Sequence, residues 1–350
     1  MQIMKDNVTI KAFRYLSELL AAVDNQKDKE NDDLISDFCL ALKKTHYNNV
    51  WHTEDYLNYV VKTLSDFLND DLSYSFFTEK LKTKYNPKKI AVVLNDDDLV
   101  ANFMDLFYVL MSGNVFYGKL SANNKYFLPA IAEMLKRFDG KFSEKILFTN
   151  GILSGFDALI LDNDNYNADI LTHYLKGRPL YQKQKKNAVA VIVGNENPDD
   201  YENLAKDVFT FFGKGNNAVS FLLTPQNFDY ESLMKSFSYY SVIKNNARYF
   251  NNYEFNKSAC LIDGVEFYDN GFLILRPSNN IASTISVIHY KEYSTIKEMM
   301  DFIDNNQQSI SAVTCKDSFL SDSVAFGCSQ KLNYHCFLRD KNEIDFVFDM

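Results

Sequence analysis

The residues best suited to nucleophilic and metal chemistry, cysteine and histidine, are few and widely spaced in this sequence. None of the five cysteines forms a C-x-x-C pair, and none of the five histidines forms an H-x-x-H or H-E-x-x-H spacing. Zinc sites depend on such close spacings, so the sequence predicts no metal site. With no secretion signal visible, reduced thiols and a cytoplasmic location are expected. These residues are Cys39, Cys260, Cys315, Cys328, Cys336, His46, His52, His173, His289 and His335.

The charge balance excludes another class of function. The 350 residues include 37 Lys and Arg against 46 Asp and Glu, which gives a net charge of −9. Nucleic-acid binding depends on a basic face, so no nucleic-acid partner is expected. No apolar run reaches the roughly 18 residues that a membrane-spanning helix needs, so no membrane span is expected either. The length and the 46% hydrophobic content predict a globular protein of more than one domain.

The apolar pattern changes near residue 87. Before this point, apolar residues recur at spacings of three and four, which predicts helices around 10–20, 34–42 and 53–68. After it, short apolar strands alternate with helical stretches, which predicts a parallel sheet with helices on both faces, as in dinucleotide-binding domains. The strands are expected at 90–94, 114–120, 145–148, 158–161 and 188–193, and the helices at 103–110 and 127–138.

The alternation continues beyond residue 194 with different content. Helices are expected at 201–211, 228–237 and 295–305, and strands at 218–223, 259–262, 271–275, 284–289, 311–315 and 344–348. The sequence therefore predicts an α/β protein in four parts. These are a helical N-terminal segment (1–86), a nucleotide-binding-type domain (87–194), a catalytic-type α/β domain (195–335) and a C-terminal strand or tail (336–350).

Several short segments occur in an order that is found in one known family. They are Trp51–Glu54, Lys119–Lys125, Leu128–Pro129, Val193–Glu196, Phe212–Gly215, Val219–Ser220, Asn251–Lys257 and Asp269–Phe272. From about residue 48 to the C-terminus the chain resembles the LuxC-type fatty-acyl-CoA reductases of the aldehyde dehydrogenase superfamily. The resemblance implies an aldehyde-dehydrogenase-like fold with two parallel-sheet α/β domains. It also implies reduction of a fatty acyl thioester to an aldehyde with NADPH or NADH.

The family's reaction needs a thiolate, an oxyanion site and a phosphate site, and this chain departs from the family pattern at all three. Asn216 stands where the family has its nucleophilic cysteine, and an amide cannot form a thioester. Asp97 takes the place of the oxyanion-binding asparagine, and a carboxylate repels a developing oxyanion. Asp162, Asn163 and Asp164 match the phosphate-facing Thr-Gly-Ser, where acids oppose a pyrophosphate.

Other matched positions are retained. Lys119 matches the lysine that hydrogen-bonds the cofactor ribose, and the alternative is a solvated lysine at the end of a strand. Ser121 follows Lys119 in the same cofactor-binding segment. Glu196 matches the family's Gly-Asn-Glu and could orient water or contact the nicotinamide side. The alternative for Glu196 is an acid placed at a helix N-terminus ahead of Pro198.

The resemblance and the departures together predict a catalytically inactive family member that acts as a binding or assembly partner. The partner would be an active relative, an acyl carrier protein or acyl-CoA, and a homo-oligomer is also possible. Residue 216 is expected at the base of an interdomain cleft, with Asp97 and Glu196 within about one side-chain length.

Two alternatives remain open at this stage. The first is a working reductase or acyl-transfer enzyme with another nucleophile, for which Cys328 is the candidate. The second concerns the run Lys183–Lys186, which either grips an acyl carrier protein or CoA phosphates or forms a solvated face.

Overall fold

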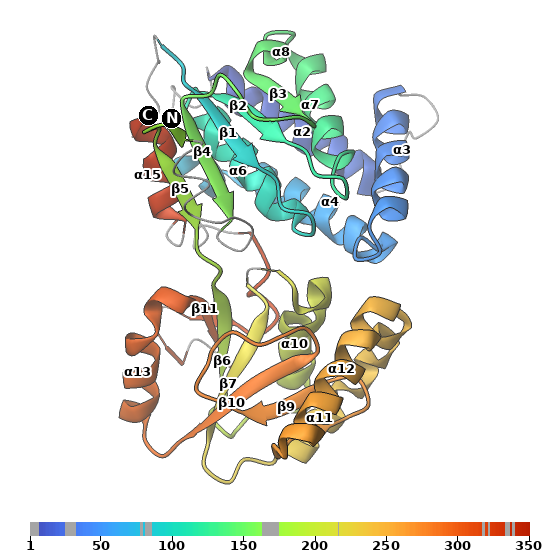
Figure 1. The fold of residues 1–350 in the computed structure, drawn as a ribbon, viewed down its shortest axis with the longest axis vertical. Coiled ribbons are helices and arrows are strands. Elements are labelled where there is room, and N and C mark those ends of the chain that lie inside the picture. The colour runs from blue at the N-terminus through green and yellow to red at the C-terminus, as the bar shows by residue number, and fades with distance from the viewer. Residues whose placement is uncertain are drawn as a thin grey trace. The chain divides into compact units, whose positions relative to one another are not determined.

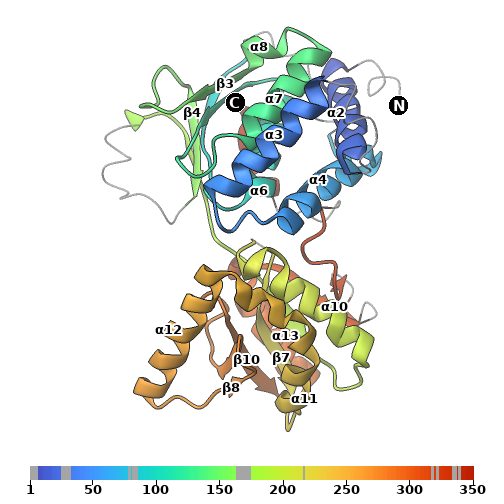
Figure 2. The same cartoon turned by 90° about the vertical axis from the view of Figure 1, so that its right-hand side faces the viewer.

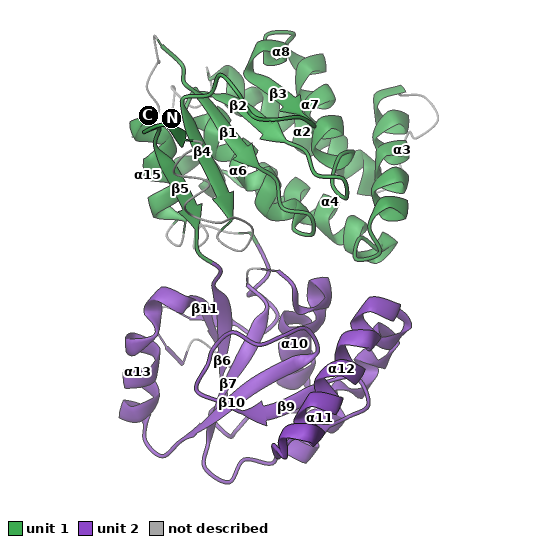
Figure 3. Ribbon diagram, viewed as in Figure 1, with its two compact units in different colours: residues 1–184, 332–350 green, residues 185–331 purple. Residues whose placement is uncertain are grey.

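The computed structural model divides the chain into two compact units, coloured separately in Figure 3. Unit 1 comprises residues 1–184 and 332–350, and unit 2 comprises residues 185–331. Unit 2 is therefore a continuous stretch of chain that is inserted into unit 1. The residues that the structure describes are 7–24, 33–77, 80, 86–162, 175–215, 217–316, 319–320, 323–332, 337 and 340–350.

Five parallel strands form the sheet of unit 1, in the order β3-β2-β1-β4-β5 (Figure 1). The central strands are continuous apolar runs, and the side chains of Ile90, Ala91 and Val92 are fully buried. Such runs are typical of strands that are covered on both faces. The strands are β1 (Lys89–Val93), β2 (Val115–Lys119), β3 (Ile146–Thr149), β4 (Ala158–Asp162) and β5 (Leu180–Lys183).

The N-terminal helices belong to unit 1 and pack with the helices of its sheet. In Figure 2 helices α2, α3, α4, α6 and α7 lie to one side of the strands. The predicted N-cap at Thr53 is confirmed, since its side chain accepts a hydrogen bond from the Tyr56 N–H at 3.3 Å. Leu153, Phe156 and Leu175 are buried against β1 and β4. The helices are α2 (Val8–Asp24), α3 (Asp33–Asn48), α4 (Glu54–Asn69), α5 (Leu72–Ser75), α6 (Leu99–Met111), α7 (Phe127–Phe138), α8 (Phe142–Lys145) and α15 (Lys341–Asp349).

Unit 2 has a seven-stranded sheet in the order β12-β11-β6-β7-β10-β9-β8, parallel except for β8. Figure 1 shows α13 on one side of this sheet and α10, α11 and α12 on the other. Met299 of α13 is buried against Val189, Val191, Phe221 and Leu223. The strands are β6 (Asn187–Val191), β7 (Val219–Pro225), β8 (Tyr268–Asp269), β9 (Ile274–Pro277), β10 (Val287–Tyr293), β11 (Ile310–Cys315) and β12 (Val324–Ala325). The helices are α10 (Pro198–Phe209), η2 (Thr210–Gly213), α11 (Tyr230–Ser236), η3 (Phe237–Asn245), α12 (Ala247–Asp263), α13 (Ile296–Asn305) and η4 (Gln307–Ser309).

Three sequence predictions are corrected by these elements. The run 259–262 is the last turn of helix α12, which Asn246 caps and which Gly264 ends in a left-handed conformation. The predicted strand 344–348 is helix α15, in which Ile344 and Val347, three residues apart, are buried. Apolar runs of four or five residues do not distinguish a strand from a buried helical turn. The domain boundary predicted at 194 moves to 184, because β6 pairs with β7 and β11 of unit 2.

Helix α15 closes unit 1 through a buried charge cluster. Lys183, at the end of β5, pairs with Asp105 of α6, and its Nζ lies 3.5 Å from Glu343 Oε2 of α15. Burial raises the pKa of Asp105 and raises that of Glu343 strongly, while Lys183 opposes both changes. The Lys183 side chain is only 18% exposed, so Lys183 belongs neither to a solvated face nor to a docking patch.

Among the described residues, no helix combines the length and apolar character that crossing a bilayer requires.

We expect Glu343→Gln to change the pH dependence of stability. The folded-state pKa of Glu343 lies above the ordinary value of 4.5, so its stabilising contribution is present below that value and is lost as the pH rises through the folded-state pKa. Glutamine removes this titration but still donates a hydrogen bond to Asp105. Urea unfolding at pH 5 and pH 8 should show that the unfolding free energy of the variant, relative to that of wild type, rises by about 1 kcal/mol or more from the lower to the higher pH. Glu144→Gln, at an exposed position, is the control, and an equal difference at both pH values would contradict the expectation.

Candidate functional site

The carboxyl edge of the unit 1 sheet is organised by Asn95, which follows β1. Its Oδ1 accepts hydrogen bonds from the N–H groups of Asp97 (2.8 Å) and Asp98 (3.0 Å). Its Nδ2 donates to Asp162 Oδ2 at 2.7 Å, which joins the ends of β1 and β4. Its backbone N–H donates to Asn102 Oδ1, and its carbonyl accepts from the side chains of Asn102 and Asn124. Asn95 thus uses all of its polar groups within this edge.

The N-terminus of helix α6 is capped by the carboxylate of Asp98. Its Oδ1 accepts the Ala101 N–H at 2.9 Å, in the position where a bound anion is often found at a helix N-terminus. The N–H groups of Asp97, Asp98 and Ala101 are therefore bonded to the side chains of Asn95 and Asp98, and the Leu99 N–H donates to Tyr56 Oη at 3.2 Å.

Asp97, predicted at the oxyanion position, is held from several directions within unit 1. Its Oδ1 accepts from Asn49 Nδ2 at 3.1 Å, and its carbonyl accepts from Tyr56 Oη at 3.0 Å. Burial, together with the carboxylates of Asp98 and Asp97, raises the pKa of Tyr56 well above its ordinary value. Because Tyr56 stays protonated, it remains a donor to this turn.

The predicted cofactor residues lie at the same edge, as far as the structure describes them. Lys119 ends β2, and its Nζ has no hydrogen-bond or ion-pair partner among the described residues. Ser121 Oγ accepts the Asn124 N–H at 2.9 Å. Asp162 ends β4 and bonds Asn95. Asn163 and Asp164 lie outside the described residues.

Glu196 braces the turn that follows β6 in unit 2. Its two carboxylate oxygens accept the N–H groups of Val193 (2.7 Å) and Gly194 (2.9 Å). The first turn of α10 is capped instead by Asn197, which exchanges hydrogen bonds with Asp200. Asn216 lies outside the described residues and Asp97 belongs to unit 1, so the proximity of the three stays a prediction.

The segment that precedes residue 216 has an unusual backbone. Phe211, Phe212 and Gly213 have φ values of 59°, 58° and 70°, three consecutive residues in the left-handed region. Two bulky residues held there cost on the order of 1–3 kcal/mol each, and strain of this kind is found mostly at functional sites. Gly215 is needed for space, because a Cβ would lie 2.7 Å from Gln330 Oε1 and 3.0 Å from the Phe211 ring.

A buried carboxylate fixes the segment that packs against Gly215. Asp207 of α10 accepts the N–H groups of Gly327 (2.7 Å) and Ser329 (2.9 Å) and the Thr314 hydroxyl (3.3 Å). Burial raises the pKa of Asp207, and these hydrogen bonds oppose the rise. Asp207 therefore holds Cys328, a half-buried free thiol, and Gln330 beside the turn at residues 211–215.

Two polar atoms next to this turn are buried and have no hydrogen-bond partner among the described residues. They are Asn217 Oδ1 and Gln330 Nε2. Buried polar atoms in native proteins are nearly always paired, and each exception needs a cause. Their grouping around Gly215 marks this segment of unit 2 as a candidate binding region.

Among the described residues, no group of three or more His, Cys, Asp or Glu side chains is arranged to hold a metal ion. The four described cysteines are free.

The sequence matches no protein-family profile and no curated protein. The structure is nevertheless similar to many solved aldehyde dehydrogenases. An indole-3-acetaldehyde dehydrogenase in complex with NAD+ matches with a TM-score of 0.60 and 11% identity, and the match covers 90% of this chain and 73% of the other. The aldehyde dehydrogenase KauB from Pseudomonas aeruginosa matches with a TM-score of 0.60 and 13% identity, covering 90% of this chain and 72% of the other. The glyceraldehyde-3-phosphate dehydrogenase GapN from Methanocaldococcus jannaschii in complex with NADP matches with a TM-score of 0.60 and 10% identity, covering 95% of this chain and 84% of the other.

The fold is therefore that of the NAD(P)-dependent aldehyde dehydrogenases. This confirms the predicted fold class, an aldehyde-dehydrogenase-like α/β protein with two largely parallel sheets and a helical N-terminal segment. Identities of 10–13% establish the fold alone.

Sequence reasoning missed Asn95, Asp207 and Gln330. Asn95 and Asp98 flank the Asp96–Asp97 pair, and an Asn-x-x-Asp run ahead of an apolar helix is itself a capping signal. Asp207 lies at a buried position of an amphipathic helix, and a carboxylate there requires a partner. Nothing in the sequence connects Asp207 to residues 327–329.

We expect Asp207→Ala to loosen the segment 326–330. The N–H groups of Gly327 and Ser329 would lose their acceptor, at a cost of about 2–5 kcal/mol in unfolding free energy. Urea unfolding measures the loss, and hydrogen exchange should become faster at these two amides. Glu202→Ala, exposed on the same helix, is the control. Unchanged exchange at 326–330 would show that Asp207 does not hold the segment.

Proposed function

We propose that this protein is a catalytically inactive relative of the LuxC-type fatty-acyl-CoA reductases and acts as a binding or assembly partner. Its partner is an active relative, an acyl carrier protein or acyl-CoA. The observation that carries the proposal is the carboxyl edge of unit 1, where Asn95 and Asp98 occupy N–H groups at the start of α6 that would otherwise be free to bind an anion.

The charges at this edge support the same conclusion. Asp96, Asp97, Asp98 and Asp162 lie at or next to the ends of β1 and β4, and Asn123 Nδ2 donates to Asp96 Oδ2 at 3.1 Å. Among the described residues of this edge, Lys119 and Lys125 have no acidic partner within 4 Å, whereas Lys183 pairs with Asp105 and Glu343. The carboxylates of this edge outnumber these two cations and oppose the binding of a pyrophosphate.

Unit 2 supports binding more than it supports chemistry. An asparagine at position 216 supplies no nucleophile, but the turn before it is strained, and the buried Gln330 Nε2 beside that turn has no hydrogen-bond partner among the described residues. Strain and unpaired polar groups are costly, and a bound partner would offset that cost. The second candidate function, acyl transfer at Cys328, rests on Asp207 holding this thiol segment against Gly215.

We expect NADH and NADPH to bind weakly or not at all. Isothermal titration calorimetry with cofactor in the millimolar range measures this directly. Binding in the micromolar range would mean that the phosphate contacts lie away from Asp98 and Asp162. In that case Asp98→Asn, which keeps the helix cap and removes the charge, should bind the cofactor with the affinity of wild type.

We expect Asn216→Cys to restore a thiol without restoring the enzyme. The variant should be acylated slowly by palmitoyl-CoA, visible by intact mass spectrometry, and release no aldehyde with NADPH. The loss of one oxyanion donor typically costs on the order of 10²–10³ in rate, and a carboxylate at position 97 costs more. Wild type should acquire no acyl group. An acyl adduct on wild-type Cys328, or NADPH consumption by wild type, would favour the second candidate function.

A further inference from the structure

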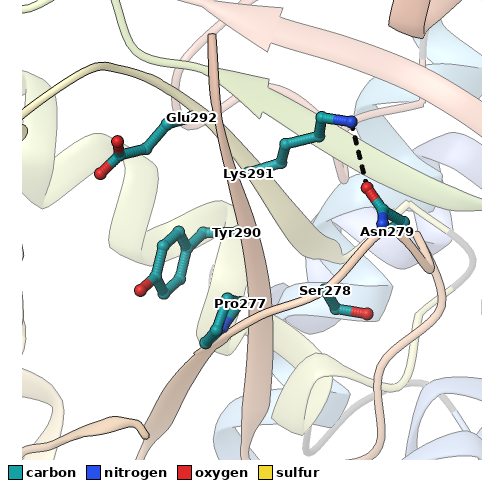
Figure 4. A pocket seen from close by; sticks show the side chains of 6 residues that line it. All are labelled: Pro277, Ser278, Asn279, Tyr290, Lys291 and Glu292. Atoms are coloured by element: carbon teal, nitrogen blue, oxygen red, sulfur yellow. Dashed lines mark hydrogen bonds between the residues drawn. The ribbon is translucent and has the colours of Figure 1, made fainter.

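An open pocket of about 470 Å³ lies in unit 2, where β9 ends and β10 continues (Figure 4). Its volume falls in the range of small-molecule sites. It lies apart in sequence from the segments around residues 216 and 330. Its lining residues are Pro277, Ser278, Asn279, Tyr290, Lys291 and Glu292.

The two sides of strand β10 give this pocket different chemistry. Figure 4 shows Tyr290 and Glu292 on one side of the strand and Lys291 reaching toward Asn279 on the other. The Lys291 Nζ donates to Asn279 Oδ1 at 3.0 Å. The carboxylates that act on Tyr290 are those of Glu292 and Glu266, on the side opposite Lys291. Basic and acidic groups of the pocket are therefore separated by the strand.

A second cation, which does not itself line the pocket, lies on the same face of the sheet as Lys291. Arg276 of β9 is in register with His289 of β10, and its Nε donates to His289 Nε2 at 3.2 Å. His289 is buried and donates from Nδ1 to the Asn280 carbonyl at 2.7 Å, so its Nε2 must be the acceptor for Arg276. Burial, and then the charge of Arg276, lower the pKa of His289 and keep it neutral.

The groups that this side presents are donors. Neither Arg276 nor Lys291 has an acidic partner within 4 Å among the described residues. The two terminal nitrogens of Arg276 and the Asn279 Nδ2 make no hydrogen bond to described residues. The Ser278 Oγ accepts a hydrogen bond from the Asn280 N–H, so the Ser278 hydroxyl proton is available to be donated. Lys291 follows His289 by two residues, so its Cα lies about 7 Å further along the same face.

We propose that Arg276 and Lys291, with Ser278 and Asn279, form a binding site for the phosphate group of a small phosphorylated molecule. A guanidinium held through Nε presents its two remaining nitrogens as a planar fork, which matches two oxygens of a phosphate. A phosphate monoester carries close to two negative charges at neutral pH, and the two cations match this charge.

The charge of the whole chain makes such binding selective. A net charge of −9 repels anions from most of the surface, so a phosphate that binds must find a local cluster of donors. The site does not depend on the proposed function, because none of its residues belongs to the edge of unit 1 or to the turn at residues 211–215.

Calorimetric titration of the full chain with inorganic phosphate, AMP and acetate tests this site. We expect inorganic phosphate and AMP to bind one per chain with a Kd of about 1 mM or tighter, and acetate to bind more weakly. AMP binding that is tighter than phosphate binding would identify a nucleotide as the source of the phosphate, and equal affinities would identify the free anion. Arg276→Gln and Lys291→Gln should each weaken phosphate binding by about ten- to a hundredfold.

Lys297→Gln is the matched control, because Lys297 is an exposed lysine of the neighbouring helix α13. Phosphate binding by this variant should equal that of wild type. If Arg276→Gln does not fold, Arg276→Lys keeps the charge and removes the planar fork, and it should still weaken binding. The proposal is wrong if phosphate does not bind at about 10 mM, if acetate binds as tightly, or if Lys297→Gln loses as much affinity as Lys291→Gln.

Discussion

The hydrogen bonds of Asn95 determine the chemistry of unit 1. One side chain occupies the N–H groups of Asp97 and Asp98 through its Oδ1 and joins β1 to the Asp162 carboxylate of β4 through its Nδ2. In parallel α/β sheets, the carboxyl edge is where ligands bind because N–H groups and helix ends remain available there. In this protein, Asn95 and Asp98 satisfy those groups internally. The fold of a dehydrogenase is preserved while the binding capacity of this edge is spent on its own stability.

Unit 2 uses a carboxylate in the opposite way. Asp207 is buried, and its hydrogen bonds hold the segment 326–330 against a turn whose two phenylalanines are in the left-handed region. The result is a region that is well positioned and in which the buried Gln330 Nε2 has no hydrogen-bond partner among the described residues. In the described part of unit 1 the edge is satisfied internally, whereas the turn of unit 2 is constrained and keeps an unpaired polar group. This difference between the units is the reason why we propose a binding protein.

The sequence predicts helices and strands well where the apolar pattern is long. It predicts contacts poorly where the two partners are far apart in the sequence. The runs at 90–94 and 188–193 and the helices before residue 70 are read correctly, because burial on both faces or along one stripe leaves a clear period. The short runs at 259–262 and 344–348 carry no such period. The link from Arg276 to His289 exists only through the parallel register of β9 and β10, which no local pattern reveals. Lys183, predicted at the surface, is buried by a helix far along the chain.

The insertion of unit 2 into unit 1 orders events during synthesis. Residues 185–331 emerge from the ribosome as one continuous stretch and include every strand of their own sheet, so this unit has all of its parts before residues 332–350 are made. Unit 1 does not, since Glu343 and Phe348, which cover Lys183 and Phe77, are translated after the whole of unit 2. Until α15 is made, a charged lysine and an aromatic surface of unit 1 stay uncovered on the nascent chain.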